Sequence, residues 1–163
     1  MSSYRITVDK NALTFAAGHF ITYSDHGLEP VHGHNYRVSA QLIGELDEHS
    51  LVYDFVALRG DMEQLLSELD HRFLHSEANP RLDTQVGETE VEIRHGDRRY
   101  VFPRGDVVLL PIPNTTAERL AGLLADRLAG RLDERGVRNI DSITVEVEEA
   151  PGQSASFTRG PVR

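Results

Sequence analysis

The order of the periodic segments constrains the fold of this chain more than any other feature. Between residues 55 and 69, apolar side chains recur at helical spacing, and Asp54 stands where the N-cap of a helix belongs. A second helical segment follows Pro113, and segments that alternate apolar and polar residues lie toward both ends of the chain. Strands grouped at both ends with helices between them predict an α+β fold, in which an antiparallel four-stranded sheet carries two helices on one face.

The second helix is expected to begin at the sequence TTAE, a capping box in which Thr115 is the N-cap and Glu118 its reciprocal partner. Gly136 is typical of a residue that ends a helix, so the helix should stop there. The leucines expected on its buried face are Leu120, Leu123, Leu124, Leu128 and Leu132.

The strands are predicted from shorter alternating runs. Residues 4–19 contain two such runs around the polar sequence DKNA and predict an antiparallel hairpin. A third strand is expected from Asn35 to Ile43, and two more around APGQS near the end of the chain. Residues 76–88 are polar and predict a loop, whereas residues 89–102 alternate around HGD and predict a surface hairpin.

Composition narrows the class of protein. A length of 163 residues suits one domain spanning 1–163, and no apolar run approaches the length that crosses a bilayer. The start lacks a basic segment followed by an apolar one, so we expect a soluble, cytoplasmic protein with no membrane partner. The formal charge of −9 argues against a nucleic-acid partner, and the absence of cysteine excludes thiolate ligands and thiol nucleophiles.

The sequence HGHNY places two histidines, His32 and His34, on the same face of a strand if Gly33 is extended. His19, at the end of the preceding predicted strand, is a candidate third ligand. Three imidazoles with an open fourth position are typical of catalytic zinc sites, although nickel, cobalt or iron also accept imidazole. Spacing alone leaves a metal site and ordinary histidines both open. The remaining histidines with no expected role in a site are His26, His49, His75 and His95.

The sequences FAAGH, HGHNY, VYDFVALR, LDHRFLH, PNTTAERLA and VEEAPGQSASF together resemble the 6-pyruvoyltetrahydropterin synthase and 6-carboxytetrahydropterin synthase family, in the same order and over nearly the whole chain. The resemblance implies a tunnelling fold, zinc held by His19, His32 and His34, and a small pterin substrate. It also implies a homo-oligomer, trimers stacked into hexamers with the sheets paired into a barrel and sites at subunit boundaries. The hairpin at 89–102 resembles an insertion relative to shorter members.

Other site residues follow from the same resemblance. Asp70 and His71 match the family's catalytic pair, although a helix end with a dipole-compensating histidine explains them as well. Glu149 matches the glutamate that anchors the pterin ring, against the alternative that Glu146, Glu148 and Glu149 form a solvated acidic edge. Thr115 and Thr116 match positions near the pterin.

The chain departs from the family pattern at Leu28, where many members carry a cysteine. Glu29 instead stands three residues before His32, and E-x-x-H-G-H resembles a glutamate-bearing branch linked to folate biosynthesis. That resemblance implies a zinc-dependent lyase that converts 7,8-dihydroneopterin, or its triphosphate, to 6-hydroxymethyl-7,8-dihydropterin with Glu29 as base.

Several alternatives stay open. They are 6-carboxytetrahydropterin or 6-pyruvoyltetrahydropterin synthase activity, a non-catalytic pterin- or purine-binding module, and a protein that binds a metal for structure alone. The sequence also leaves open whether the substrate carries a triphosphate and whether the pathway makes a folate or a deazapurine such as queuosine.

Overall fold

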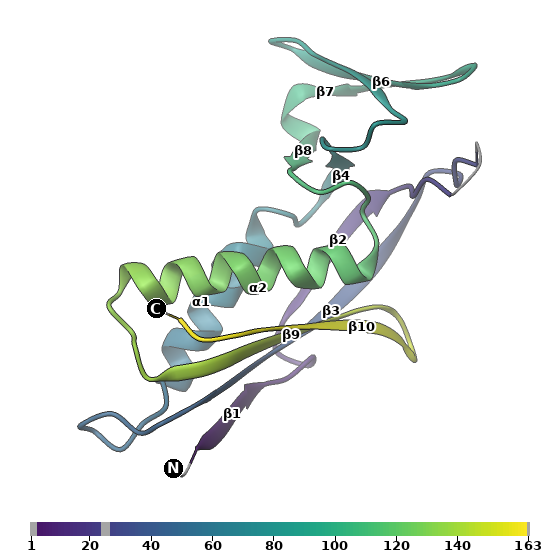
Figure 1. Ribbon diagram of the computed structural model, residues 1–163. Coiled ribbons are helices and arrows are strands. Elements are labelled where there is room, and N and C mark those ends of the chain that lie inside the picture. Colours follow the sequence, from purple (N-terminus) through teal and green to yellow (C-terminus); the bar gives the residue numbers. More distant parts are fainter. Residues whose placement is uncertain (1–2, 24–26, 163) are drawn as a thin grey trace.

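The computed structural model describes residues 3–23 and 27–162 (Figure 1). In these residues the chain forms two sheets and two long helices. The strands are β1 (Tyr4–Val8), β2 (Thr14–His19), β3 (His32–Gly44), β4 (Arg72–Ser76), β5 (Asp83–Val86), β6 (Glu90–His95), β7 (Arg98–Pro103), β8 (Val107–Leu110), β9 (Ile140–Ala150) and β10 (Gln153–Arg159); the helices are α1 (Phe55–Ser67), the short 3-10 helix η1 (Arg104–Asp106) and α2 (Ala117–Glu134).

The large sheet has seven strands, in the order β10-β9-β3-β2-β4-β8, with β1 paired to β3 off this path. The prediction of a four-stranded antiparallel sheet is therefore wrong. Strands β4 and β8 were not predicted at all, and both the β2–β4 and the β4–β8 pairs are parallel. The sequence did not predict them because each is short and almost continuously buried or half-buried. Neither therefore shows the alternation that marks a strand with one solvated face.

The predicted hairpin of residues 4–19 is also wrong. Strands β1 and β2 lie end to end along the same edge of β3, which pairs with β1 through residues 40–44 and with β2 through residues 32–37. The sequence DKNA does form a turn, closed by the Ala12 N–H to Asp9 carbonyl bond. This turn carries the chain onward instead of reversing it, because the Leu13 side chain is buried and its carbonyl binds the Val38 N–H.

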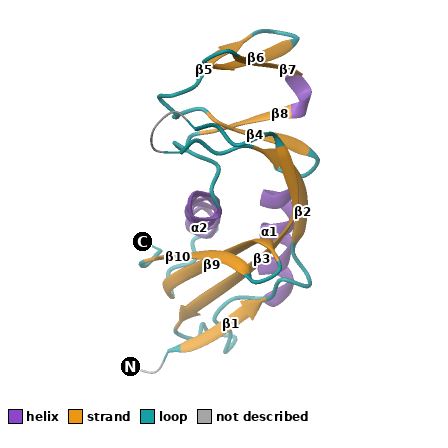
Figure 2. Cartoon of the chain, turned by 90° about the vertical axis from the view of Figure 1, so that its right-hand side faces the viewer, coloured by secondary structure: helices purple, strands orange, loops and turns teal. Residues whose placement is uncertain are grey.

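Both helices cover one face of the large sheet (Figure 2). Asp54 caps α1 as expected, accepting the Ala57 N–H at 2.8 Å, but α1 ends at Ser67, two residues before the helical spacing of apolar side chains ends at residue 69. Helix α2 ends before Gly136, whose φ of +74° suits glycine. Its N-cap is Thr116, not Thr115 as predicted, since the Thr116 side chain accepts the Arg119 N–H.

The second sheet, β5-β6-β7, contains the predicted hairpin at 89–102, which turns at Gly96. Strand β5 lies in the segment that was predicted to be a loop. In Figure 1 this small sheet stands beyond β4 and β8. Within the described part of the chain, neither long helix has the length and apolar character needed to span a bilayer.

Candidate active site

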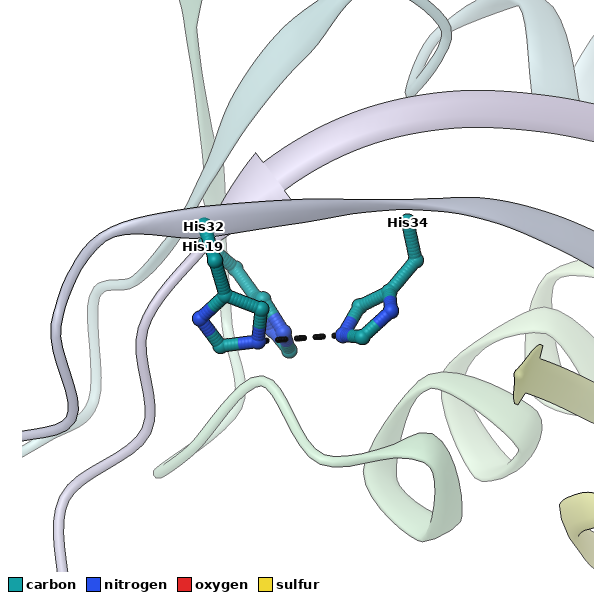
Figure 3. Close-up of side chains that lie close together, drawn as sticks. All are labelled: His19, His32 and His34. Carbon is teal, nitrogen blue, oxygen red and sulfur yellow. Dashed lines mark hydrogen bonds between the residues drawn. The ribbon is translucent and has the colours of Figure 1, made fainter.

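Three histidines converge at the junction of β2 and β3. The strand register pairs His19 with His32 and Ala17 with His34, so the alternation of side chains places all three rings on the face that the helices cover. Gly33 lies within β3, in the extended conformation that the prediction required. The Nε2 atoms of His32 and His34 are 3.0 Å apart, and one ring nitrogen from each histidine lies within 4.8 Å of the others (Figure 3).

Backbone carbonyls orient two of the three rings. The Nδ1 of His19 lies 3.0 Å from the Thr115 carbonyl, and the Nδ1 of His32 lies 2.9 Å from the Pro30 carbonyl. A carbonyl only accepts, so each Nδ1 donates its hydrogen and the Nε2 keeps a free lone pair. Burial lowers the pKa of His19 to about 4, which keeps this ring neutral near pH 7, as a metal ligand must be.

The donor set of this cluster fits a metal that prefers nitrogen ligands. A tetrahedral zinc with Zn–N bonds near 2.0–2.1 Å separates its ligand nitrogens by about 3.3 Å. The 3.0 Å between the His32 and His34 nitrogens is close to that spacing, and a ring nitrogen of His19 lies within 4.8 Å of both. Three imidazoles therefore form a site that zinc, cobalt, nickel or iron can occupy.

Glu29 lies beside the histidine cluster. One carboxylate oxygen is 3.8 Å from the His32 Nε2 and accepts the Ile21 N–H at 3.3 Å. The other oxygen accepts from the Tyr23 hydroxyl at 3.4 Å, and the charge of Glu29 raises the pKa of Tyr23. The carboxylate is thus held beside the histidine cluster and is partly exposed, with its side chain 25% accessible.

A cavity of about 340 Å³ opens next to these groups and is large enough for a bicyclic molecule. Five of the predicted site residues line it, namely His19, Glu29, His32, Thr116 and Glu149. The cavity wall also includes residues that the sequence did not point to: Ile21, Ala117, Glu118, Gln153, Ser154 and Ala155. The residues of β10 were missed because their place in the wall depends on the β9–β10 turn.

The three glutamates of VEVEE do not form one acidic edge. Glu146 and Glu148 bind the Lys10 ammonium, at 2.5 Å and 2.8 Å, whereas Glu149 lines the cavity. Glu146 and Glu148 share one face of β9, whereas Glu149 shares the opposite face with the buried Val145 and Val147. The alternation of side chains along the strand therefore explains why adjacent glutamates have different surroundings.

Thr115 is buried behind His19. Its hydroxyl donates to the Phe20 carbonyl at 3.0 Å and lies 3.2 Å from the His19 Nδ1. Asn114 holds the same segment by accepting the Thr22 N–H and donating to the Thr22 carbonyl. Asn114 was not predicted; its place in the turn-forming sequence PNTT was the available signal.

Tyr36 is another buried neighbour that the sequence did not identify. Its hydroxyl lies 3.4 Å from both ring nitrogens of His19, and its ring packs 5.4 Å from the His34 ring. Burial raises the pKa of Tyr36, so the hydroxyl stays protonated. The tyrosine therefore packs a neutral group against His19 and His34.

Asp70 and His71 lie apart from this cavity. The Asp70 carboxylate accepts the Ala16 N–H at 2.8 Å, a bond that lowers the pKa of Asp70, and lies 2.9 Å from the His71 Nδ1. His71 has a left-handed φ of +57° and its side chain is 82% exposed. The pair lines a second cavity of about 370 Å³ with Asn35 and Arg37. A single chain thus does not unite the predicted pair with the histidine cluster.

The histidines predicted to have no site role lie elsewhere. His49 is exposed, His75 is buried on β4 and His95 ends β6, and none of these three lines the first cavity. His26 lies outside the described residues.

Comparison with known proteins gives consistent matches along the chain. Residues 7–160 match the family model described as 6-pyruvoyl tetrahydropterin synthase. A relative from Methanocaldococcus jannaschii, named "Putative 6-carboxy-5,6,7,8-tetrahydropterin synthase", is 32% identical over 148 residues, 90% of each chain. A relative from Pyrococcus abyssi with the same name is 32% identical over 145 residues, 88% of this chain and 85% of its own.

Solved structures agree with this. The crystal structure of 6-pyruvoyl tetrahydropterin synthase from Plasmodium vivax has a TM-score of 0.91 at 27% identity, covering 98% of this chain and 99% of that one. Two variants of that enzyme, in which a catalytic glutamate is replaced by alanine or by cysteine, have the same TM-score at 26% identity.

Proposed function

The chain belongs to the 6-pyruvoyl tetrahydropterin synthase family, and from that membership we propose that it is a zinc-dependent lyase acting on 7,8-dihydroneopterin or its triphosphate. The proposed product is 6-hydroxymethyl-7,8-dihydropterin. One observation carries the proposal: in a chain without cysteine, the Glu29 carboxylate lies 3.8 Å from the His32 Nε2 at the wall of the cavity. Since one family model spans residues 7–160, we also propose a single domain.

His19, His32 and His34 are the proposed zinc ligands. Zinc held there supplies Lewis-acid polarisation, which lowers the pKa of a hydroxyl on the substrate side chain. The three rings stand on two paired strands, so the protein provides them in a preformed arrangement. The Thr115 and Pro30 carbonyls keep two of the rings in the required tautomer.

Glu29 is the proposed base. Its carboxylate takes the proton from the hydroxyl on the second side-chain carbon, and the freed electron pair forms a carbonyl there. The bond between the first and second side-chain carbons breaks, and its electrons pass into the C=N bond of the dihydropterin ring. Protonation of the first carbon then leaves a hydroxymethyl group on the ring, and the second and third carbons depart as glycolaldehyde or its triphosphate.

The Plasmodium vivax enzyme has a catalytic glutamate, which its variants replace by alanine or cysteine, and this supports a catalytic role for a glutamate in the present chain. Glu29 is our candidate for the equivalent group, because it contacts the histidine cluster. A carboxylate is suited to taking a hydroxyl proton, whereas a thiolate is better suited to taking a proton from carbon, so Glu29 favours cleavage of the side chain over elimination.

Glu149 is the proposed anchor of the pterin. Its carboxylate lines the cavity and can accept two parallel hydrogen bonds from the amino group and ring N–H of the pterin edge. Thr116 lines the same wall, and the backbone beside it belongs to the first turn of α2, where N–H groups face outward. Thr115 acts on the substrate only indirectly in this proposal, since its hydroxyl is bound to Phe20.

Asp70 and His71 are the proposed acid pair, supplied by a second copy of the chain. In one chain they line a different cavity from Glu29, and His71 is exposed, so a neighbouring subunit must present them. We therefore propose a homo-oligomer, a trimer or a hexamer of two trimers, in which strands pair across open sheet edges to form a barrel. A stable monomer in light scattering would contradict this part of the proposal.

A second candidate is 6-carboxytetrahydropterin synthase activity. The observation that favours it is the name shared by the relatives from Methanocaldococcus jannaschii and Pyrococcus abyssi, each 32% identical to this chain. 6-Pyruvoyltetrahydropterin formation is a related outcome, given the Plasmodium vivax enzyme. Both reactions lead to products of a different mass from 6-hydroxymethyl-7,8-dihydropterin.

The test is product identification with zinc-loaded protein and each form of dihydroneopterin. We expect 6-hydroxymethyl-7,8-dihydropterin by mass spectrometry, and a loss of rate of about 10²- to 10⁴-fold in Glu29→Gln. The matched control is Glu48→Gln, because Glu48 also lies beside a histidine, 3.6 Å from His49, but on the exposed surface.

Three results decide against the proposal. A 6-carboxy or 6-pyruvoyl product favours the second candidate. Tight pterin binding with no product, unchanged in Glu29→Gln, favours a binding module. Equal rates for Glu29→Gln and Glu48→Gln would show that Glu29 does not act as the base.

A further inference from the structure

The small sheet β5-β6-β7 reaches the loop that carries Glu29. The Arg98 Nη1 donates to the Leu28 carbonyl at 2.9 Å, one residue before Glu29. The Leu28 side chain is also buried, in a cluster with Val91 and Ile93 of β6. The small sheet therefore holds the loop by a charged hydrogen bond and by apolar contact.

The alternation of β7 explains why Arg98 reaches this loop. Arg98, Tyr100 and Phe102 share one face of the strand, and Tyr100 and Phe102 pack on the buried cluster. Arg99 points to the opposite face and pairs with Glu92. Two adjacent arginines on one strand thus have different roles, and only Arg98 touches the loop.

The backbone around Leu28 leaves its carbonyl available to Arg98. Leu28 faces Thr22 in an isolated antiparallel bridge. The bonds on either side of this bridge, Tyr23 N–H to Gly27 and Glu29 N–H to Ile21, do not use the Leu28 carbonyl. Arg98 supplies a donor for it, and so fixes the peptide group that leads directly into Glu29.

The small sheet also packs against the residue that follows His19. Phe20 follows His19, and its ring lies 5.2 Å from both Tyr100 of β7 and Phe73 of β4. The small sheet therefore contacts both backbone segments that meet at the Thr22–Leu28 bridge, the one leading from His19 and the one leading to Glu29. Figure 2 shows this sheet beyond β4 and β8.

We propose that Arg98 is a positioning residue, through which the β6–β7 hairpin holds the Glu29 carboxylate at the reaction site. The inference rests on the proposed function, since it takes Glu29 to be the base. Arg98 binds the peptide before Glu29 and is not among the residues that line the cavity, so its removal leaves the substrate contacts in place and loosens the position of the base. A misplaced base lowers the rate of proton transfer more than it lowers substrate binding.

The experiment compares Arg98→Met with Arg98→Lys, with Arg99→Met as the matched control on the opposite face. In zinc-loaded protein we expect Arg98→Met to lower kcat about 10-fold, with KM changed less than about twofold. Lysine should recover part of kcat, because its ammonium can donate to the same carbonyl. Arg99→Met should keep the wild-type kcat and KM.

Two further measurements show whether Arg98 acts through Glu29. In the Glu29→Gln background, measured in single turnovers, Arg98→Met should change the rate by less than about twofold, because coupled residues are not additive. Hydrogen exchange of the Glu29 amide, which binds the Ile21 carbonyl, should become faster in Arg98→Met, while exchange of the Ala57 amide at the start of α1 should not change.

The outcomes separate this inference from the proposed function. If Arg98→Met leaves kcat and the hydrogen exchange of the Glu29 amide unchanged while Glu29→Gln is inactive, the positioning role of Arg98 is wrong. Glu29 then remains the proposed base. Additive effects of the two substitutions, or an equal loss in Arg99→Met, also overturn the role. If Glu29→Gln keeps full activity, the proposed base is wrong instead.

Discussion

Replacing Glu149 by glutamine tests the proposed pterin anchor with little change in shape. The carboxylate offers two acceptors toward the cavity, whereas the amide offers one acceptor and presents a donor to the second N–H of the pterin. The substitution therefore removes one charge-assisted hydrogen bond and places the glutamine N–H donor opposite an N–H donor of the pterin. Because Glu149 lines the cavity at the end of β9, no other part of the fold needs to move.

The size of the effect follows from that count of hydrogen bonds. A hydrogen bond to a charged group contributes about 1.5–3 kcal/mol, which corresponds to a pterin Kd about 10- to 150-fold weaker. Glu148→Gln is the matched control, since Glu148 is adjacent in sequence but binds Lys10, which Glu146 keeps paired at 2.5 Å. The control should change Kd by less than about twofold.

The assay is a calorimetric or fluorescence titration with neopterin, an oxidised pterin whose binding can be measured without turnover. The expected result is weak binding in Glu149→Gln and wild-type binding in Glu148→Gln, with similar melting temperatures for both. Equal affinities in the two variants would show that Glu149 does not anchor the pterin. A loss confined to Glu148→Gln would place the pterin on the other face of β9.

Three further predictions concern the metal, the pH dependence of stability and the buried threonine. His34→Ala should reduce zinc from about one ion per chain to near zero after dialysis, measured by elemental analysis, because two ligands hold zinc poorly; His49→Ala should retain it. Burial lowers the pKa of His75 to about 4, so the unfolded state, with a histidine pKa near 6.5, binds more protons below pH 6.5. The unfolding free energy of metal-free protein should therefore fall as pH drops from 6.5 to 4, by about 3 kcal/mol for this residue, and denaturant titrations of His75→Gln should show a smaller fall. Thr115→Val should lower the unfolding free energy by about 1–3 kcal/mol in the same assay, because it leaves the Phe20 carbonyl without its donor. Thr116→Ala should lower it less, because it removes a helix cap that contributes about 1 kcal/mol. Equal losses in the two variants would contradict the buried role of Thr115.

Local patterns predicted the helices well because their causes are local. Asp54 caps α1, and Gly136 follows α2, where the periodic leucines indicated. The cap of α2 was placed one residue early, because either threonine of TTAE satisfies the sequence pattern. Burial of Thr115 against Phe20 decided between them, and that contact joins residues far apart in the chain.

The meeting of His32 and His34 was predictable, since residues two apart on a strand share a face. Whether His19 lies beside these two rings depends on the register of β2 with β3, which pairs His19 with His32 and is decided only by the sheet. The family resemblance supplied that third ligand, and the match over residues 7–160 confirms the family. The roles of the individual residues remain predictions to be tested by substitution.

The sequence by itself determined the elements with local periodicity, the pairing of imidazoles with a nearby carboxylate, and the family. Tertiary structure alone decided that β1 and β2 share one edge of β3, and that β4 and β8 join the sheet in parallel. It also decided that the face of β9 with Glu149 lines the cavity, and that Asp70 lies apart from the histidine cluster. The physical reason is that capping and side-chain alternation act within a few residues. Strand partners depend on which buried surfaces fit together across the whole chain.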